Sequence, residues 1–71
     1  MKSTKLKAIA FDCKGGSCPV IYRSGNGRFF VQGYEVSRTL KTQVKLAKNE
    51  NLIEVPKSLL QQLITNSEEL L

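Results

Sequence analysis

The chain has 71 residues, of which 41% are apolar and 24% charged, so it is long enough for one small domain and too apolar to be wholly disordered. No apolar run reaches the roughly 20 residues of a membrane-spanning helix and no signal-length apolar stretch opens the chain, so we expect a cytoplasmic protein with no membrane partner. The charge is unevenly distributed. Residues 1–48 have ten Lys or Arg and two acidic residues, a net charge of +8, whereas residues 49–71 have one Lys and four Glu, a net charge of −3. This asymmetry fits binding to nucleic acid, binding to an acidic protein, or a solvated basic surface.

The first predicted element is an edge strand over residues 5–11. Lysines alternate there with apolar residues, and lysines on an edge strand discourage aggregation. Residues 13–19 should form a loop, because a Gly-Gly pair and a proline interrupt both helix and strand.

A β-hairpin is the strongest local prediction. Residues 20–23 and 28–32 are rich in β-branched and aromatic residues, and the intervening Ser-Gly-Asn-Gly supplies the residue types that tight turns require. The alternation of apolar residues slips at Gly33, which predicts a bulge or a sharp bend. We therefore place the hairpin and its continuation within residues 20–36.

The middle of the chain is ambiguous between helix and strand. Ser37 can cap a short helical turn from Arg38 to about Val44, with apolar residues four apart on one face. The β-branched residues of this segment would also suit a strand. The polar residues 48–51 predict a turn that closes the connection.

A short strand and a helix follow. Residues 52–55 alternate as a strand, and Pro56 fits the first position of a helix that ends near Asn66. Residues 67–71 either extend this helix or fray. Leu59, Leu60, Leu63 and Ile64 form an apolar stripe along the helix. Gln61, Gln62 and Thr65 face away from this stripe.

These elements predict an α+β fold with a small antiparallel sheet of about three to five strands and one C-terminal helix that covers its apolar face. The sheet includes the hairpin of residues 20–36, and the helix covers about residues 56–66. We expect a single domain of residues 1–71, frayed at residues 1–4 and 67–71. A homodimer is also expected, because so small a core gains stability from a second subunit.

Three stretches of the chain resemble a group of small bacterial proteins of similar length. They are Gly16-x-Cys18-Pro19-Val20-Ile21-Tyr22, Phe30-Val31-Gln32-Gly33-Tyr34-x-Val36 and Glu54-Val55-Pro56-x-x-Leu59-Leu60. Some members of the group are encoded near helix-turn-helix regulators, so the resemblance implies a role in regulation. Many members have an acidic, helix-favouring stretch where this chain has residues 37–42, so the middle segment differs here.

A second, local resemblance concerns residues 52–60, which are similar to the strand-Pro-helix segment of swapped-hairpin DNA-binding antitoxins. Those domains build their core by exchanging strands between two subunits. The resemblance therefore implies a dimer, although the hairpin of residues 20–32 has no counterpart in them.

Cys13 and Cys18 are the only pair of soft metal ligands, and the chain has no histidine. A tetrahedral zinc site needs four ligands, so one chain would supply half of it and a dimer would complete it. A disulfide across the Gly-Gly loop would act as a redox-sensitive clip in a cytoplasmic protein. Two reduced cysteines that pack at a strand end are the third alternative, and all three stay open at this point.

The chain lacks the usual residues of an enzyme. No histidine can act as a base beside a thiol, and the sole aspartate, Asp12, is expected to cap a turn. The glycine pairs lack the spacing and the strand-to-helix context of phosphate loops, so they predict turns. We therefore expect no catalysis, no cofactor and no small-molecule substrate.

A nucleic-acid-binding module is the first functional hypothesis, because aromatic rings on a sheet can stack bases while arginines hold phosphates. The candidate contacts are Arg23, Arg28, Arg38, Lys41, Tyr22 and Phe29. The alternative for the hairpin is a core position for Phe29 or Phe30 beneath a solvated basic rim.

The rival hypothesis is a protein-interaction adaptor that uses the C-terminal helix or a sheet edge. Its candidate contacts are Leu63, Leu70 and Leu71. Basic and exposed aromatic residues that converge on one face would favour nucleic acid, whereas an apolar patch beside the helix would favour the adaptor.

Overall fold

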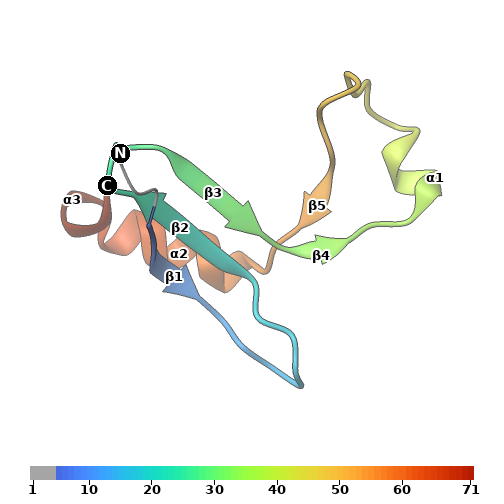
Figure 1. The fold of residues 1–71 in the computed structure, drawn as a ribbon. Helices are drawn as coiled ribbons and strands as arrows, with labels where there is room; N and C mark the ends of the chain where they lie inside the picture. The colour runs from blue at the N-terminus through green and yellow to red at the C-terminus, as the bar shows by residue number, and fades with distance from the viewer. Residues whose placement is uncertain (1–4) are drawn as a thin grey trace.

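The computed structural model describes residues 5–71 and confirms the α+β fold (Figure 1). Its antiparallel strands form a three-stranded sheet in the order β1 (Leu6–Phe11), β2 (Val20–Ser24) and β3 (Phe29–Gln32), and a two-stranded sheet of β4 (Tyr34–Glu35) and β5 (Ile53–Glu54). Its helices are α1 (Arg38–Lys41), α2 (Lys57–Thr65) and α3 (Ser67–Leu70). The fraying expected at residues 1–4 lies outside the described residues.

Strands β1 and β2 belong to one long hairpin, with β1 at the sheet edge as predicted. The ladder continues beyond the strands, since Lys14 and Ser17 exchange backbone hydrogen bonds of 2.9 and 3.0 Å. Gly15 and Gly16 have φ values of 55° and 87°, the left-handed conformations that a two-residue hairpin turn requires. The Gly-Gly pair therefore forms the turn instead of interrupting the ladder.

The predicted hairpin between β2 and β3 is also present, but it ends at Gln32 instead of continuing to residue 36. At Gly33 the chain leaves the first sheet and enters the second. A Cβ at this position would lie only 2.7 Å from the Glu54 carbonyl oxygen, so the two backbones approach closer than any side chain allows. The strand is interrupted where the alternation slips, and this close approach is the reason that glycine fits there.

Helix α2 covers one face of the three-stranded sheet and creates the core. The central cluster is small: Ala10, Ile21 and Leu59 are buried, and their partly buried neighbours are Ile9, Val55 and Leu63. A register shift between Ala8 and Ala10 lets two consecutive residues of β1 reach this cluster. The predicted core position for Phe29 or Phe30 is wrong, because Phe29 is 46% exposed and Phe30 is only half-buried.

Helix α2 differs from its prediction in two ways. Pro56 is the N-cap, with an extended ψ of 153°, so the helix begins one residue later at Lys57. The apolar stripe also divides, because Leu60 and Ile64 are 48% and 76% exposed while Leu59 and Leu63 pack on the sheet. A break at Asn66 then separates α2 from the short helix α3.

Residues 34–54, here called the arm, project from the rest of the described chain, here called the body (Figure 1). No described residue of the arm is buried. The radius of gyration of 13.8 Å exceeds the roughly 11 Å of a compact chain of this length, as a projecting arm requires. The arm contains α1, the predicted helical turn, whose cap is a 3.2 Å hydrogen bond that the Leu40 amide donates to the Ser37 hydroxyl.

Candidate binding surfaces of the sheet

The face of the sheet opposite α2 carries most of the aromatic side chains. Because Ala10 and Ile21 point toward α2, the residues next to them in each strand point the other way. The strand register places Tyr22 directly opposite Phe30 on this face. We call it the open face, and its members are Phe11, Val20, Tyr22, Arg28, Phe30 and Gln32.

Hydrogen bonds hold the side chains of the open face in place. The Tyr22 hydroxyl donates to Gln32 Oε1 at 3.3 Å, and Gln32 Nε2 donates to the Cys18 carbonyl at 2.6 Å. Val20 lies on the same face and is only 6% exposed, which indicates that the side chains around it form a closed layer. The Tyr22 ring is thus part of an ordered surface.

A cation lies beside the aromatic pair. The Arg28 guanidinium carbon is 5.3 Å from the centroid of the Phe30 ring, a typical cation–π distance. Arg28 extends from the β2–β3 turn, where its amide donates to the buried Ser24 hydroxyl at 3.1 Å. The turn therefore fixes the backbone from which this side chain extends.

The predicted nucleic-acid candidates do not converge on one surface. Tyr22 and Arg28 lie on the open face, whereas Arg23 and its neighbour Phe29 point toward the α2 side. Arg38 and Lys41 lie on α1, at the far end of the arm from the β2–β3 turn (Figure 1). Phe11 is the aromatic residue of the open face that sequence reasoning did not consider as a contact, whereas the spacing of two between Arg28 and Phe30 already places that pair on one face.

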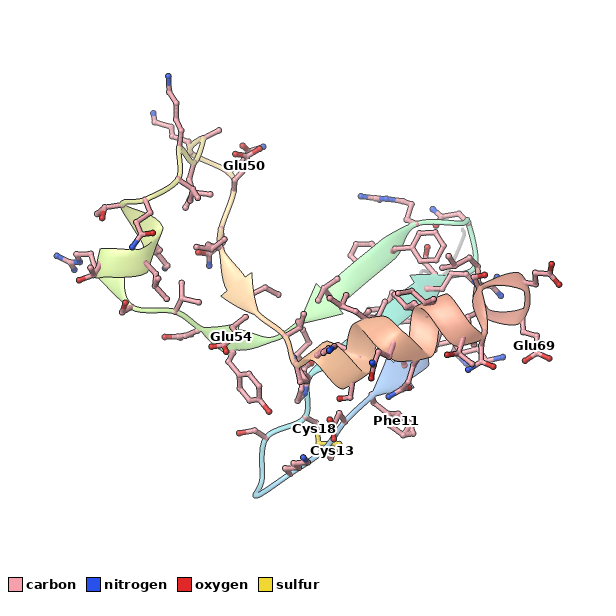
Figure 2. The ribbon with its side chains drawn as sticks, turned by 180° about the vertical axis from the view of Figure 1, so that it is seen from behind. Phe11, Cys13, Cys18, Glu50, Glu54 and Glu69 are labelled. Carbon is pink, nitrogen blue, oxygen red and sulfur yellow. A yellow bond between two sulfur atoms is a disulfide. The ribbon has the colours of Figure 1, made fainter. Side chains whose placement is uncertain are left out.

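The two cysteines form a disulfide at the tip of the first hairpin (Figure 2). They face each other between the pairs Asp12–Pro19 and Lys14–Ser17, so they occupy a non-hydrogen-bonded position of the ladder. Their Cα atoms are 4.1 Å apart, as expected for such a position. Among residues 5–71, no group of three or more His, Cys, Asp or Glu side chains could hold a metal ion.

The prediction that Asp12 caps a turn is wrong, because Asp12 lies in the ladder of the first hairpin, three residues before the turn at Gly15 and Gly16. Its carboxylate accepts a hydrogen bond from the Ser58 hydroxyl in the first turn of α2. Gln62, one turn further, accepts from the Phe11 amide at 3.3 Å and donates to the Phe11 carbonyl at 2.9 Å. These bonds tie α2 to the β1 side of the sheet and correct the prediction that Gln62 faces away.

The attachment of α2 to β1 leaves β3 uncovered on the same face. Leu60 and Ile64 lie on the flank of α2 opposite Ser58 and Gln62, hence toward β3. Phe29 and Val31 on β3 point to this side of the sheet and are about half exposed. We call this region the apolar surface; it consists of Phe29, Val31, Leu60, Ile64 and Leu71.

The adaptor candidates occupy three different environments near this region. Leu63 packs against the core, Leu70 is half-buried, and Leu71 is 60% exposed. Leu71 lines a hollow together with Phe29 and Arg23, at the end of the sheet where the β2–β3 turn lies. Of the three candidates, Leu71 is therefore the one available to a partner.

No helix of the described residues is long and apolar enough to cross a membrane. Comparison with protein-family models, with curated proteins and with solved structures found no match to this chain. The two resemblances noted from sequence motifs therefore stay predictions.

Proposed function

We propose that this protein is a non-catalytic module that binds single-stranded nucleic acid through its open face. The observation that carries the proposal is the cross-strand pair Tyr22–Phe30 with the Arg28 guanidinium over the Phe30 ring. The two partly exposed rings and a positive charge thus lie within one small area of the sheet face opposite α2. The resemblance to proteins encoded near regulators is compatible with such a role.

Physical chemistry gives this arrangement a binding mode. Bases stack on aromatic rings and on guanidinium planes, and each stacked base contributes about 1–3 kcal/mol. Tyr22 and Phe30 offer rings on adjacent strands, and Arg28 offers a charged plane that can also reach a phosphate. The net charge of +5 attracts polyanions at long range, whatever their sequence.

Fluorescence anisotropy with a labelled oligothymidine, measured over a salt series, tests the proposal. We expect Arg28→Ala to weaken binding about tenfold, which corresponds to about 1.4 kcal/mol. It should also reduce the slope of log affinity against log salt by about 0.7, the contribution of one phosphate contact on a single strand.

Arg38→Ala is the matched control, because it removes the same charge from the far end of the arm. It should change the affinity little. Tyr22→Phe should keep most of the affinity and Tyr22→Leu should lose it, since stacking requires the ring and not the hydroxyl. Equal losses for Arg28→Ala and Arg38→Ala, or no binding at low salt, would contradict the proposal.

A second candidate function is protein interaction, and the observation that favours it is the apolar surface. An apolar patch beside the helix is the feature that the adaptor hypothesis requires, and Leu60 and Ile64 of α2 are 48% and 76% exposed. The open face and the apolar surface lie on opposite sides of the sheet. One chain could therefore use both.

A further inference from the structure

We infer that a second copy of this chain covers the apolar surface, forming a two-fold dimer in which each protomer's Ile64 packs on the other's Phe29 and Val31. Ile64 is 76% exposed, the most exposed of the large apolar side chains among the described residues. A two-fold interface places the same surface on both partners, so an apolar surface of this kind is complementary to itself. The inference does not depend on the proposed nucleic-acid binding.

The size of the core argues for a second copy. In the described part of the chain, the buried apolar residues besides Pro19 are Ala10, Val20, Ile21 and Leu59. Domains of this length gain stability from subunit association when one core is too small. The five side chains of the apolar surface would at least double the number of buried apolar residues.

The required area is modest. A specific interface buries about 1,200 Å² in total, or roughly 600 Å² on each chain. That is about a tenth of the 5917 Å² accessible surface of one chain. Strand β3 and helix α2 each supply two of the exposed apolar residues on this side of the sheet, and Leu71 lines the hollow beside Phe29.

The charges favour this surface over the rest of the molecule. A chain of net charge +5 repels its own copy, so two copies should meet where Lys and Arg are absent. None of the five residues of the apolar surface is charged. Arg23, which lines the adjoining hollow opposite Phe29, and Lys7, the next residue in the cross-strand row, are cations at its rim.

The two outer edges of the sheet differ in how they are protected, and this difference also favours a partner on the β3 side. Lys5 and Lys7 lie at the start of the edge strand β1, and Gln62 occupies the backbone groups of Phe11 there. Strand β3, with the sequence Phe-Phe-Val-Gln, has no such charged residue, and no described strand pairs with its outer edge. Unprotected edges of this kind are normally covered.

Light scattering after size-exclusion chromatography tests the inference by measuring the molar mass of the protein. Concentrations of about 10 μM to 500 μM detect a dimer whose dissociation constant is in the micromolar range. The full chain should approach twice its mass of 7.9 kDa. Higher salt should strengthen the dimer by screening the repulsion, whereas it weakens nucleic-acid binding. The opposite signs keep failure of this inference distinguishable from failure of the proposed function.

Ile64→Lys should weaken dimerisation at least about tenfold, because the charge would be buried between two apolar surfaces. Leu40→Lys is the matched control, since it makes the same kind of change at an exposed residue of the arm and should leave the dimer intact. Circular dichroism checks that both variants fold. A single-chain mass at every concentration, a dimer that survives Ile64→Lys, or a dimer lost only in Leu40→Lys would overturn the inference.

Discussion

The body and the arm contain similar proportions of apolar residues but use them differently. In the body, Ala10, Ile21 and Leu59 come from three elements distant in sequence and bury one another. In the arm, Leu40 and Val44 are each 46% exposed, and no described arm residue is buried. The arm closes on itself only through the two residue pairs of β4 and β5.

This difference shows where the stability of the molecule resides. Apolar residues become a core when distant segments pair, as β1, β2 and α2 do, whereas a two-stranded ribbon is at most marginally stable alone. Segments with little burial open with a small free energy, while a core opens only with global unfolding. We therefore expect large effects from substitutions in the body and small ones in the arm.

Leu59→Ala should have the largest effect. Leu59 is fully buried at the centre of the core, and truncating such a residue costs about 2–5 kcal/mol. Leu40→Ala removes the same atoms from an exposed position of the arm and should cost under about 0.5 kcal/mol. Urea unfolding followed by circular dichroism measures both, and similar midpoints for the two variants would mean that the body is not the stable unit.

Removing the disulfide should have the next largest effect. Cys13 and Cys18 are five residues apart, and closing so short a loop contributes about 2 kcal/mol through the unfolded state. Adding a reductant to the native chain should therefore lower its urea midpoint. The double variant Cys13→Ser/Cys18→Ser should match the reduced protein and ignore the reductant. If the native chain had the same urea midpoint with and without reductant, the hypothesis of a redox-sensitive, stabilising disulfide would be wrong.

Gly33→Ala tests the junction between body and arm. The added Cβ would lie 2.7 Å from the Glu54 carbonyl oxygen and 2.9 Å from Ile53 Cδ1, so β5 must shift at a cost of about 1–3 kcal/mol. Gly25→Ala is the control, because a Cβ there meets nothing within 4 Å and should change stability by under about 0.5 kcal/mol. Chemical shifts should move in β4 and β5 for the first variant only; unchanged shifts there would show that the close approach is absent.

Local features of the body could be predicted from sequence because short-range chemistry determines them. The turn residues between β2 and β3, the lysines of β1 and the slip at Gly33 each act within a few residues. The helical turn after Ser37 was one of two alternatives, and the capping hydrogen bond from Leu40 explains why helix forms there.

The faces of the sheet and of α2 could not be predicted in the same way. The sideways position of α2 decides which half of its apolar stripe packs on the sheet. Two contacts set that position, and the residues in them are separated by 46 and 51 positions along the sequence. The same displacement leaves Phe29 exposed, while Phe30 lies on the opposite face of the sheet, so neither ring joins the core cluster. No periodicity within α2 distinguishes Leu60 from Leu59.

Gln62→Ala tests the contact that positions α2. Losing both hydrogen bonds to the Phe11 backbone should cost about 1 kcal/mol, the net contribution of bonds at a partly exposed site. It should also accelerate hydrogen exchange of the Phe11 amide, because that group has no strand beside it on the outer edge of β1. Gln61→Ala is the matched control, since the same side chain one residue earlier is exposed. If the two variants exchanged the Phe11 amide at equal rates, the Gln62 bonds would not position α2, and the exposure of the apolar surface would need another cause.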